Sequence, residues 1–382
     1  MEAQFNRLVK AIESRYASFF PEDQRVPFAV QLAGGPTAVF GGDEPAATLV
    51  VKDPSGMAAL RTLDVARIGD AYLNGALDVL GDLSRLLALR DLFRDRHPIL
   101  YLSRFLLPAL RGQVQSDRSW IAAHYNEDPD FFLLFLDARH RCYSQAVFES
   151  DDEPLEAAMT RKLDFALDSI GVRAGDRVLD IGGGWGAFTE YAGRKGIHVT
   201  SLTISEPSRH FVQGIIDREG LPCEIRLEHF FEHRPERPYD AIVNLGVTEH
   251  LPDYHGTLRR YHELLKPGGK VYLDASASRR KHDVSTFLER HVFPGNGSPL
   301  CLYDYLEALS RTPLQVEQVI NDRHNYLLTT HAWAEALDRH REEVERRWGM
   351  RQYRRFQVYL WGCVDGFRRD TIQAYRLVLR RP

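Results

Sequence analysis

The chain of 382 residues is poor in cysteine and methionine, with four of each. Its cysteines are scattered and form no CxxC pair, which excludes a disulfide scaffold and a zinc ribbon. No apolar run approaches the roughly 20 residues that span a bilayer. The first residues are charged throughout, so we expect no signal peptide. We therefore expect a soluble cytoplasmic protein without a metal site.

An excess of basic residues is also missing. Lysine and arginine together number 49 and aspartate and glutamate 53, which gives a net charge of −4. This balance argues against a dedicated nucleic-acid-binding protein, which would be basic overall. The chain is long enough for two domains with a sizeable core, and 44% of its residues are hydrophobic.

The first part of the chain mixes helical and strand patterns. A helical pattern covers residues 2–18, and Asp53-Pro54-Ser55 is typical of a helix start. Short runs at 28–32, 37–40 and 48–51, separated by paired glycines, predict a small antiparallel sheet. We predict an N-terminal α+β domain over residues 1–118, for which lipid binding and dimerisation both stay open. Within it, residues 97–113 form a short apolar run flanked by arginines, typical either of an interdomain helix or of an interfacial helix that touches lipid.

The pattern changes after residue 176. Apolar runs alternate with helical stretches, which predicts a mostly parallel sheet covered by helices on both faces. We predict a Rossmann-like α/β domain over residues 119–382, with a helical lid segment at 119–175 and a final strand at 373–379. The other predicted strands are Arg177–Ile181, His198–Ile204, Tyr239–Leu245 and Lys270–Ala275.

A glycine-rich turn follows the first of these strands. Gly182, Gly184 and Gly186 alternate, and a helical pattern begins at Ala187. Glycines let a ligand approach the backbone, and the first amides of the helix favour a polar or anionic group. The spacing is tighter than the GxGxxG of dinucleotide-binding folds, so it suits a ligand without a pyrophosphate. The ligand should lie outside the carboxyl ends of the strands.

The turn resembles a known motif. Asp180-Ile181-Gly182-x-Gly184-x-Gly186 is similar to motif I of the S-adenosylmethionine-dependent methyltransferases. Other motifs narrow the resemblance to the cyclopropane-fatty-acid synthase and mycolic-acid cyclopropane synthase family, because they occur in that family's order. They are Tyr143-Ser144, Leu202-Thr203-Ile204-Ser205, Glu249-His250 and the Lys-Pro-Gly-Gly turn at 266–269. The resemblance implies a class I methyltransferase fold.

The same resemblance implies which residues bind the cofactor S-adenosylmethionine. Tyr143 and Ser144 would close over it, and Thr203 and Ile204 would contact its methionine or ribose part. Asp180 and the three glycines would bind it at the turn. Ser208 stands where the family often has glutamine, and Glu206 is a further candidate for the ribose.

For catalysis the resemblance nominates Glu249, His250 and Tyr326. In the family an alkene attacks the sulfonium methyl group and leaves a carbocation, which a carboxylate such as that of Glu249 can stabilise. Tyr326 matches the tyrosine that helps to hold a bicarbonate ion, the base of typical members. From the residues alone, two alternatives stay open: Glu249 could cap the next helix, and His250 could be a core or cap histidine.

Two departures from the family's pattern concern the base. Gln145 replaces a cysteine, and Asp274 replaces a histidine after the Lys-Pro-Gly turn. A negative charge at residue 274 disfavours an anion beside Glu249. We therefore expect that bicarbonate is not used and that Asp274 acts as the base or orients it. Proton loss from a neighbouring carbon, with a methyl-branched or methylene product, is the alternative.

The implied function is transfer of a one-carbon unit from S-adenosylmethionine to the double bond of an unsaturated acyl chain, which a phospholipid could carry. Residues 283–305 are rich in Phe, Tyr and Leu and suggest a lid or channel wall. Peripheral contact with the inner membrane surface and a homodimer stay open. Two alternatives are a C- or N-methyltransferase for a small natural product, and a catalytically impaired homologue that binds lipid.

Overall fold

The computed structural model describes residues 1–22, 25–95, 128–294 and 297–382. These form two compact units. The first contains the N-terminal residues up to 95 together with 285–292 and 337–365, and the second contains the rest. The predicted domain boundary at 118–119 and the apolar run at 97–113 lie outside the described residues. The two later segments that join the first unit were not predicted from the sequence.

The first unit is built on a four-stranded sheet in the order β2-β1-β3-β4. The predicted antiparallel sheet is wrong in one respect, because β1 pairs in parallel with β3, with Phe28 opposite Ala47. Two chain reversals bring β3 back in the direction of β1, and β3 lies beside β1 rather than beside β2. Turn residues predict the reversals but not the neighbour. The strands are β1 (Phe28–Leu32), β2 (Thr37–Phe40), β3 (Ala47–Val51) and β4 (Leu77–Gly81).

Helices complete the core of this unit. Helix α1 (Glu2–Phe19) buries residues at helical spacing, as the sequence predicts, and these are Phe5, Leu8, Ile12 and Tyr16. The Asp53 side chain caps α2 by accepting hydrogen bonds from the backbone amides of Ser55 and Gly56, which confirms the predicted helix start. The other helices are α2 (Pro54–Leu60), α3 (Val65–Leu73), α4 (Leu83–Leu87), the 3-10 turn η2 (Arg90–Leu92), α12 (Thr286–His291), α15 (Arg341–Trp348) and most of α16 (Met350–Arg368).

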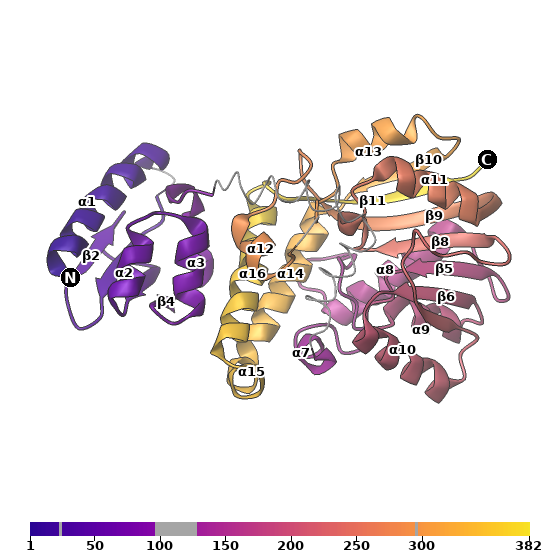
Figure 1. Cartoon of the computed structure of the whole chain (residues 1–382), viewed down its shortest axis with the longest axis horizontal. Coiled ribbons are helices and arrows are strands. Elements are labelled where there is room, and N and C mark those ends of the chain that lie inside the picture. The colour runs from indigo at the N-terminus through magenta and orange to yellow at the C-terminus, as the bar shows by residue number, and fades with distance from the viewer. Residues whose placement is uncertain (23–24, 96–127, 295–296) are drawn as a thin grey trace. The chain divides into compact units, whose positions relative to one another are not determined.

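The second unit contains a seven-stranded sheet in the order β10-β11-β9-β8-β5-β6-β7, which confirms the predicted α/β class (Figure 1). The five strands from β9 to β7 are parallel, and β11 pairs antiparallel with β9 and β10. The strands are β5 (Arg177–Ile181), β6 (His198–Thr203), β7 (Glu224–Leu227), β8 (Tyr239–Leu245), β9 (Leu265–Ala277), β10 (Gln315–Asn321) and β11 (Gln373–Arg380).

Helices cover both faces of this sheet (Figure 1). Helices α11 and α13 pack on one face, and α8 and α9 pack on the other. The helices of this unit are α7 (Pro129–Leu133), α8 (Leu155–Ile170), α9 (Ala187–Arg194), α10 (Glu206–Glu219), the 3-10 turn η3 (Thr248–His250), α11 (Tyr254–Leu264), α13 (Leu302–Leu309) and most of α14 (Arg323–Arg339).

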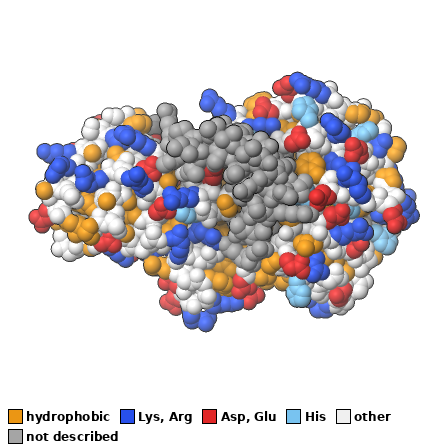
Figure 2. Space-filling model, viewed as in Figure 1, with side chains coloured by type: hydrophobic (Ala, Val, Ile, Leu, Met, Phe, Trp, Pro, Cys, Tyr) orange, Lys and Arg blue, Asp and Glu red, His pale blue; other side chains and the backbone are white. Residues whose placement is uncertain are grey.

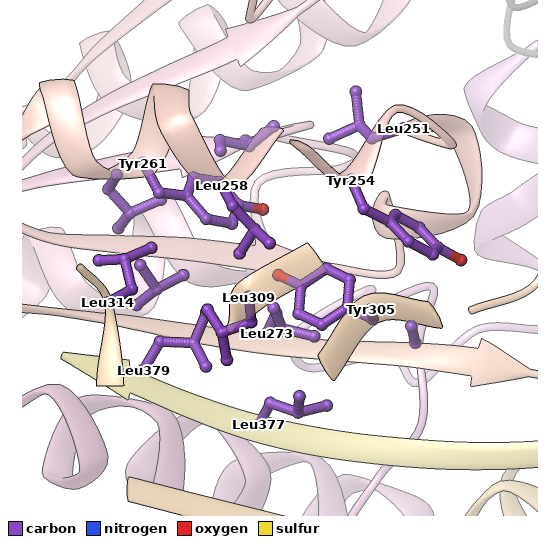
Figure 3. Close-up of a cluster of buried hydrophobic side chains, with 14 of the residues drawn as sticks. Leu251, Tyr254, Leu258, Tyr261, Leu273, Tyr305, Leu309, Leu314, Leu377 and Leu379 are labelled. Carbon is purple, nitrogen blue, oxygen red and sulfur yellow. The ribbon is translucent and has the colours of Figure 1, made fainter. Parts of the chain in front are cut away.

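One face has an aromatic and leucine-rich core. Figure 3 shows side chains of α11 and α13 pointing toward those of β9 and β11. Tyr254 and Tyr305 meet edge to face, with ring centroids 5.1 Å apart. Leu300 and Tyr305, from the stretch predicted to form a lid or channel wall, are fully buried in this core.

The surface carries charge of both signs. Figure 2 shows Lys and Arg side chains interspersed with Asp and Glu over the described residues of the visible face. Among the described residues, no helix combines the length and the apolar character that a bilayer crossing requires.

Candidate active site

A cavity opens at the carboxyl ends of β5, β6, β7 and β8, the edge at which ligands bind in open α/β sheets. Four loops and the segment before α8 line it. Of the predicted site residues, those that line the cavity are Tyr143, Ser144, Asp180, Gly182, Gly184, Thr203, Ile204, Ser208 and His250. The predicted residues Gly186, Glu249, Asp274 and Tyr326 lie outside the cavity lining.

The glycines of the turn have different structural roles. All three alternating glycines have positive φ, between 50° and 82°. A Cβ on Gly182 would lie 2.3 Å from Cγ2 of Val247, so packing requires glycine there. A Cβ on Gly184 would meet nothing nearer than the Gly182 carbonyl oxygen at 3.8 Å, which leaves this backbone open to a ligand. Gly186 is the N-cap residue of α9 and packs against α10 instead.

Asp180 is buried beneath the turn and ties it to its neighbours. Its Oδ2 accepts hydrogen bonds from the hydroxyls of Ser201, at 3.0 Å, and Thr189, at 3.1 Å. Burial raises the pKa of Asp180 to about 6, against the opposing effect of these hydrogen bonds. The carboxyl group therefore joins β5, β6 and α9 at the cavity wall.

The loop after β6 supports the turn from the other side. The Ser208 hydroxyl donates to the Gly184 carbonyl at 2.6 Å, and the Ser205 hydroxyl accepts the Ser208 amide to cap α10. Ser208 thus holds the open part of the glycine turn. Glu206, the ribose candidate, is absent from the cavity lining and forms an ion pair with Arg209.

Sequence reasoning missed a second acidic candidate. Glu228, His229 and Phe230 follow β7 and line the cavity. The Oε2 atom of Glu228 lies 2.8 Å from Nδ1 of the buried His233, whose Nε2 lies 2.9 Å from the Tyr239 hydroxyl. Strand β7 has four residues, two of them charged, so its pattern is too weak to predict this loop.

A row of aromatic side chains connects Tyr326 to the cavity. Tyr326 stacks on Phe367 with centroids 4.8 Å apart and meets Trp333 edge-on at 6.3 Å. Trp333 in turn lies 5.3 Å from Tyr143, which lines the cavity. Phe132 continues the row from Tyr143, at 5.4 Å. Tyr326 is therefore a neighbour of the cavity wall, one ring removed from Tyr143.

Glu249 lies on η3, directly before the cavity-lining His250. Its Oε1 accepts two hydrogen bonds from Ser276, one from the amide at 2.6 Å and one from the hydroxyl at 2.8 Å. Its Oε2 is buried and has no hydrogen-bond partner among the described residues. Burial raises the pKa of Glu249 to about 7. One carboxylate oxygen is therefore fixed by Ser276, and the other has no hydrogen-bond partner in the part of the chain that the structure describes.

Asp274 has a partner that the sequence did not predict. Its carboxylate lies on β9, fully buried, and its Oδ2 is 3.2 Å from Nζ of Lys162, which is also fully buried. Burial raises the pKa of Asp274 against the opposing effect of Lys162. The charge at Asp274 is thus offset, which weakens the electrostatic argument against an anion there. A signal for Lys162 was present, because it falls on the apolar stripe of α8 between Met159 and Ala166.

Comparisons with known proteins show the family of the chain. The family model described as "Mycolic acid cyclopropane synthetase" matches residues 113–377. The chain belongs to this family. Cyclopropane mycolic acid synthase MmaA2 of Mycobacterium tuberculosis is 31% identical over 278 residues, which cover 68% of this chain and 96% of the relative. A probable fatty acid methyltransferase of Pseudomonas putida is 25% identical and matches 89% of each chain.

Solved structures extend the likeness to the fold. The mycolic acid cyclopropane synthase CmaA1, complexed with SAH and CTAB, aligns with a TM-score of 0.64 at 28% identity, covering 69% of this chain and 98% of that one. Coclaurine N-methyltransferase aligns with a TM-score of 0.65 at 18% identity, covering 78% and 93%, and this supports the class I methyltransferase fold alone. Family membership confirms the predicted enzyme class, an S-adenosylmethionine-dependent methyltransferase.

Proposed function

We propose that this protein transfers a one-carbon unit from S-adenosylmethionine to the double bond of an unsaturated acyl chain. The observation that carries the proposal is the buried Oε2 atom of Glu249, which has no hydrogen-bond partner among the described residues. Glu249 directly precedes the cavity-lining His250. The names of the relatives, which include cyclopropane mycolic acid synthases and a probable fatty acid methyltransferase, support the acyl substrate.

The residues present fit the cofactor. The open backbone at Gly184, held by Ser208, provides a cradle for its amino-acid part, and Glu228 and His229 provide polar groups for its nucleoside. When bound, S-adenosylmethionine supplies an electrophilic methyl group on a positively charged sulfur. Tyr143 contributes an aromatic face to the same cavity, which favours a cationic ligand.

Charge development in the substrate explains the need for Glu249. When the alkene carbon bonds to the methyl group, the carbon–sulfur bond breaks and the neighbouring alkene carbon becomes cationic. A fixed carboxylate stabilises that cation in a desolvated site. With a pKa of about 7, Glu249 is also suited to accept the proton whose loss ends the reaction. Proton loss from the transferred carbon closes a ring, and proton loss from a neighbouring carbon gives a branched alkene.

The contacts of Asp274 change the role that we propose for it. The Asp274 carboxylate is paired with the buried ammonium of Lys162, so we assign it a positioning role instead of the role of base. The Lys162 ammonium donates hydrogen bonds to Cys142 and Ser144 and forms an ion pair with Asp274. Lys162 is therefore already paired and is not a further ligand for bicarbonate, and we propose that Glu249 itself takes the role of base.

Labelled lipid analysis tests the proposal. Bacteria that express the chain would be fed methionine with a deuterated methyl group, and their lipids examined by mass spectrometry. We expect a new acyl species heavier by one labelled carbon unit, absent with Glu249→Gln. Loss of one deuterium indicates a cyclopropane or methylene product, and retention of all three a methyl branch. Unchanged lipids alongside a methylated small molecule would favour the natural-product alternative.

Membrane contact and dimerisation remain separate proposals. An acyl chain carried by a phospholipid lies in a bilayer, so we propose that the protein works at the membrane surface. In a co-sedimentation assay, the protein should pellet with vesicles of unsaturated phosphatidylethanolamine and phosphatidylglycerol. A protein that stays in the supernatant would contradict surface binding.

We also propose a homodimer. Light scattering should then give twice the chain mass of 43.8 kDa.

A further inference from the structure

A lysine occupies the apolar side of α8. Lys162 has no exposed surface, and its helical neighbours on the same side include Met159, Leu163 and Ala166. Burying an ammonium group is costly unless charge and hydrogen bonds compensate it. The partners of Lys162 therefore indicate what the residue does.

The ammonium of Lys162 contacts three acceptors from two other segments. Its Nζ lies 3.1 Å from Sγ of Cys142 and 3.2 Å from Oδ2 of Asp274, and it donates to Oγ of Ser144. The contacts with Cys142 and Ser144 are hydrogen bonds, and the contact with Asp274 is an ion pair. Burial lowers the pKa of Lys162, but Asp274 and Cys142 raise it more, so the lysine stays charged.

Two of these partners belong to the wall of the cofactor cavity. Cys142 and Ser144 line it, and so does Gly246. The Gly246 amide donates to the backbone carbonyl of Asp274 at 3.0 Å. A Cβ on Gly246 would lie 3.1 Å from Cβ of Ser144, so the two loops pack directly together. The Lys162–Asp274 pair thus lies immediately behind two walls of the cavity.

We propose that Lys162 is a positioning residue for cofactor binding: its ammonium, neutralised by Asp274, holds Ser144 and Cys142 in place at the cavity wall. A buried ion pair adds little to stability compared with apolar residues of similar size, so fold stability alone does not account for it. This positioning role rests on one part of the proposed function, namely that the cavity binds an adenosyl cofactor.

Paired substitutions separate positioning from stability. Lys162→Met alone leaves the Asp274 carboxylate buried and uncompensated, so this variant should unfold more easily. Lys162→Met combined with Asp274→Asn removes both charges and should restore the thermal midpoint. Calorimetry with S-adenosylmethionine and S-adenosylhomocysteine, on protein freed of bound nucleoside, should still give at least tenfold weaker binding for the double variant. In turnover assays, the KM for the cofactor should rise while kcat at saturation changes less than threefold.

Lys195→Met is the matched control. Lys195 pairs with Asp164 at 3.0 Å, but this pair is about half exposed and Lys195 is absent from the cavity lining. Its removal should leave cofactor affinity unchanged.

The proposal is overturned if the double variant binds the cofactor as tightly as the wild type. If the double variant does not fold, the single variant Asp274→Asn provides the test. Its affinity for the cofactor should fall at least threefold, because Lys162 loses its counter-ion. Unchanged cofactor affinity would refute the proposal. Binding is measured without acyl substrate, so a failed lipid assay leaves this result intact. A wild type that binds neither adenosyl compound refutes both proposals.

Discussion

Glu249→Gln should make the protein more stable at alkaline pH while it abolishes turnover. Burial raises the pKa of this carboxyl group from 4.5 to about 7. In the unfolded chain the group ionises near its ordinary value, so between these two values the folded protein holds a proton that the unfolded chain has lost. Stability therefore falls as the pH rises through this window. At about 1.4 kcal/mol for each pKa unit, the loss reaches about 3 kcal/mol above pH 7.

Glutamine at this position keeps an acceptor for Ser276 but carries no charge. The variant should match the wild type near pH 4 and exceed its free energy of unfolding by up to about 3 kcal/mol near pH 8.5. Urea unfolding at both pH values, followed by circular dichroism, measures the difference. A difference that does not change with pH would refute the buried, raised-pKa carboxyl group. Wild-type turnover should rise with pH through about 7, because the ionised form stabilises the cation.

Three further variants and one control variant test the rest of the site. Gly184→Ala should cost about 1 kcal/mol of stability because φ is positive, but lower cofactor affinity at least tenfold by calorimetry; unchanged affinity would exclude this backbone from the ligand site. Glu228→Gln should weaken cofactor binding severalfold, whereas Glu206→Gln, whose carboxylate pairs with Arg209 outside the cavity lining, should have no effect; equal effects would contradict the assignment. Tyr326→Phe should reduce kcat but leave cofactor affinity within twofold, and the reverse pattern would place the hydroxyl at the cofactor.

The parallel sheet was predictable because its central strands are buried on both faces. Arg177–Ile181 and Tyr239–Leu245 match β5 and β8 residue for residue, and the glycine turn follows β5 as expected. The edge strands β7 and β10 were missed, because they are short or exposed and carry polar residues. Missing β7 also meant missing Glu228.

Contacts between residues far apart in the sequence could not be predicted from local sequence patterns. The parallel pairing of β1 with β3 depends on which neighbour a strand selects after two reversals. The Lys162–Asp274 pair joins residues more than a hundred positions apart. A lysine on an apolar stripe and an aspartate inside a buried strand each indicated an unusual burial, but only the fold brings them together.

The return of residues 285–292 and 337–365 to the first unit was equally unpredictable. Arg354, on α16, is 3% exposed there and donates to the backbone carbonyl of Leu77 at 2.9 Å. Its sequence context is an ordinary charged helix. The contact partner is far away in the chain, and no local sequence pattern predicts the contact.

Reconstitution with purified protein tests the central claim most directly. The chain would be incubated with S-adenosylmethionine carrying a deuterated methyl group and vesicles of an unsaturated phospholipid, and the acyl chains would be analysed by mass spectrometry. We predict that label enters the acyl chain at the former double bond, with the wild type and not with Glu249→Gln. Tight binding of the cofactor by the wild type without any label in the lipid would contradict the claim.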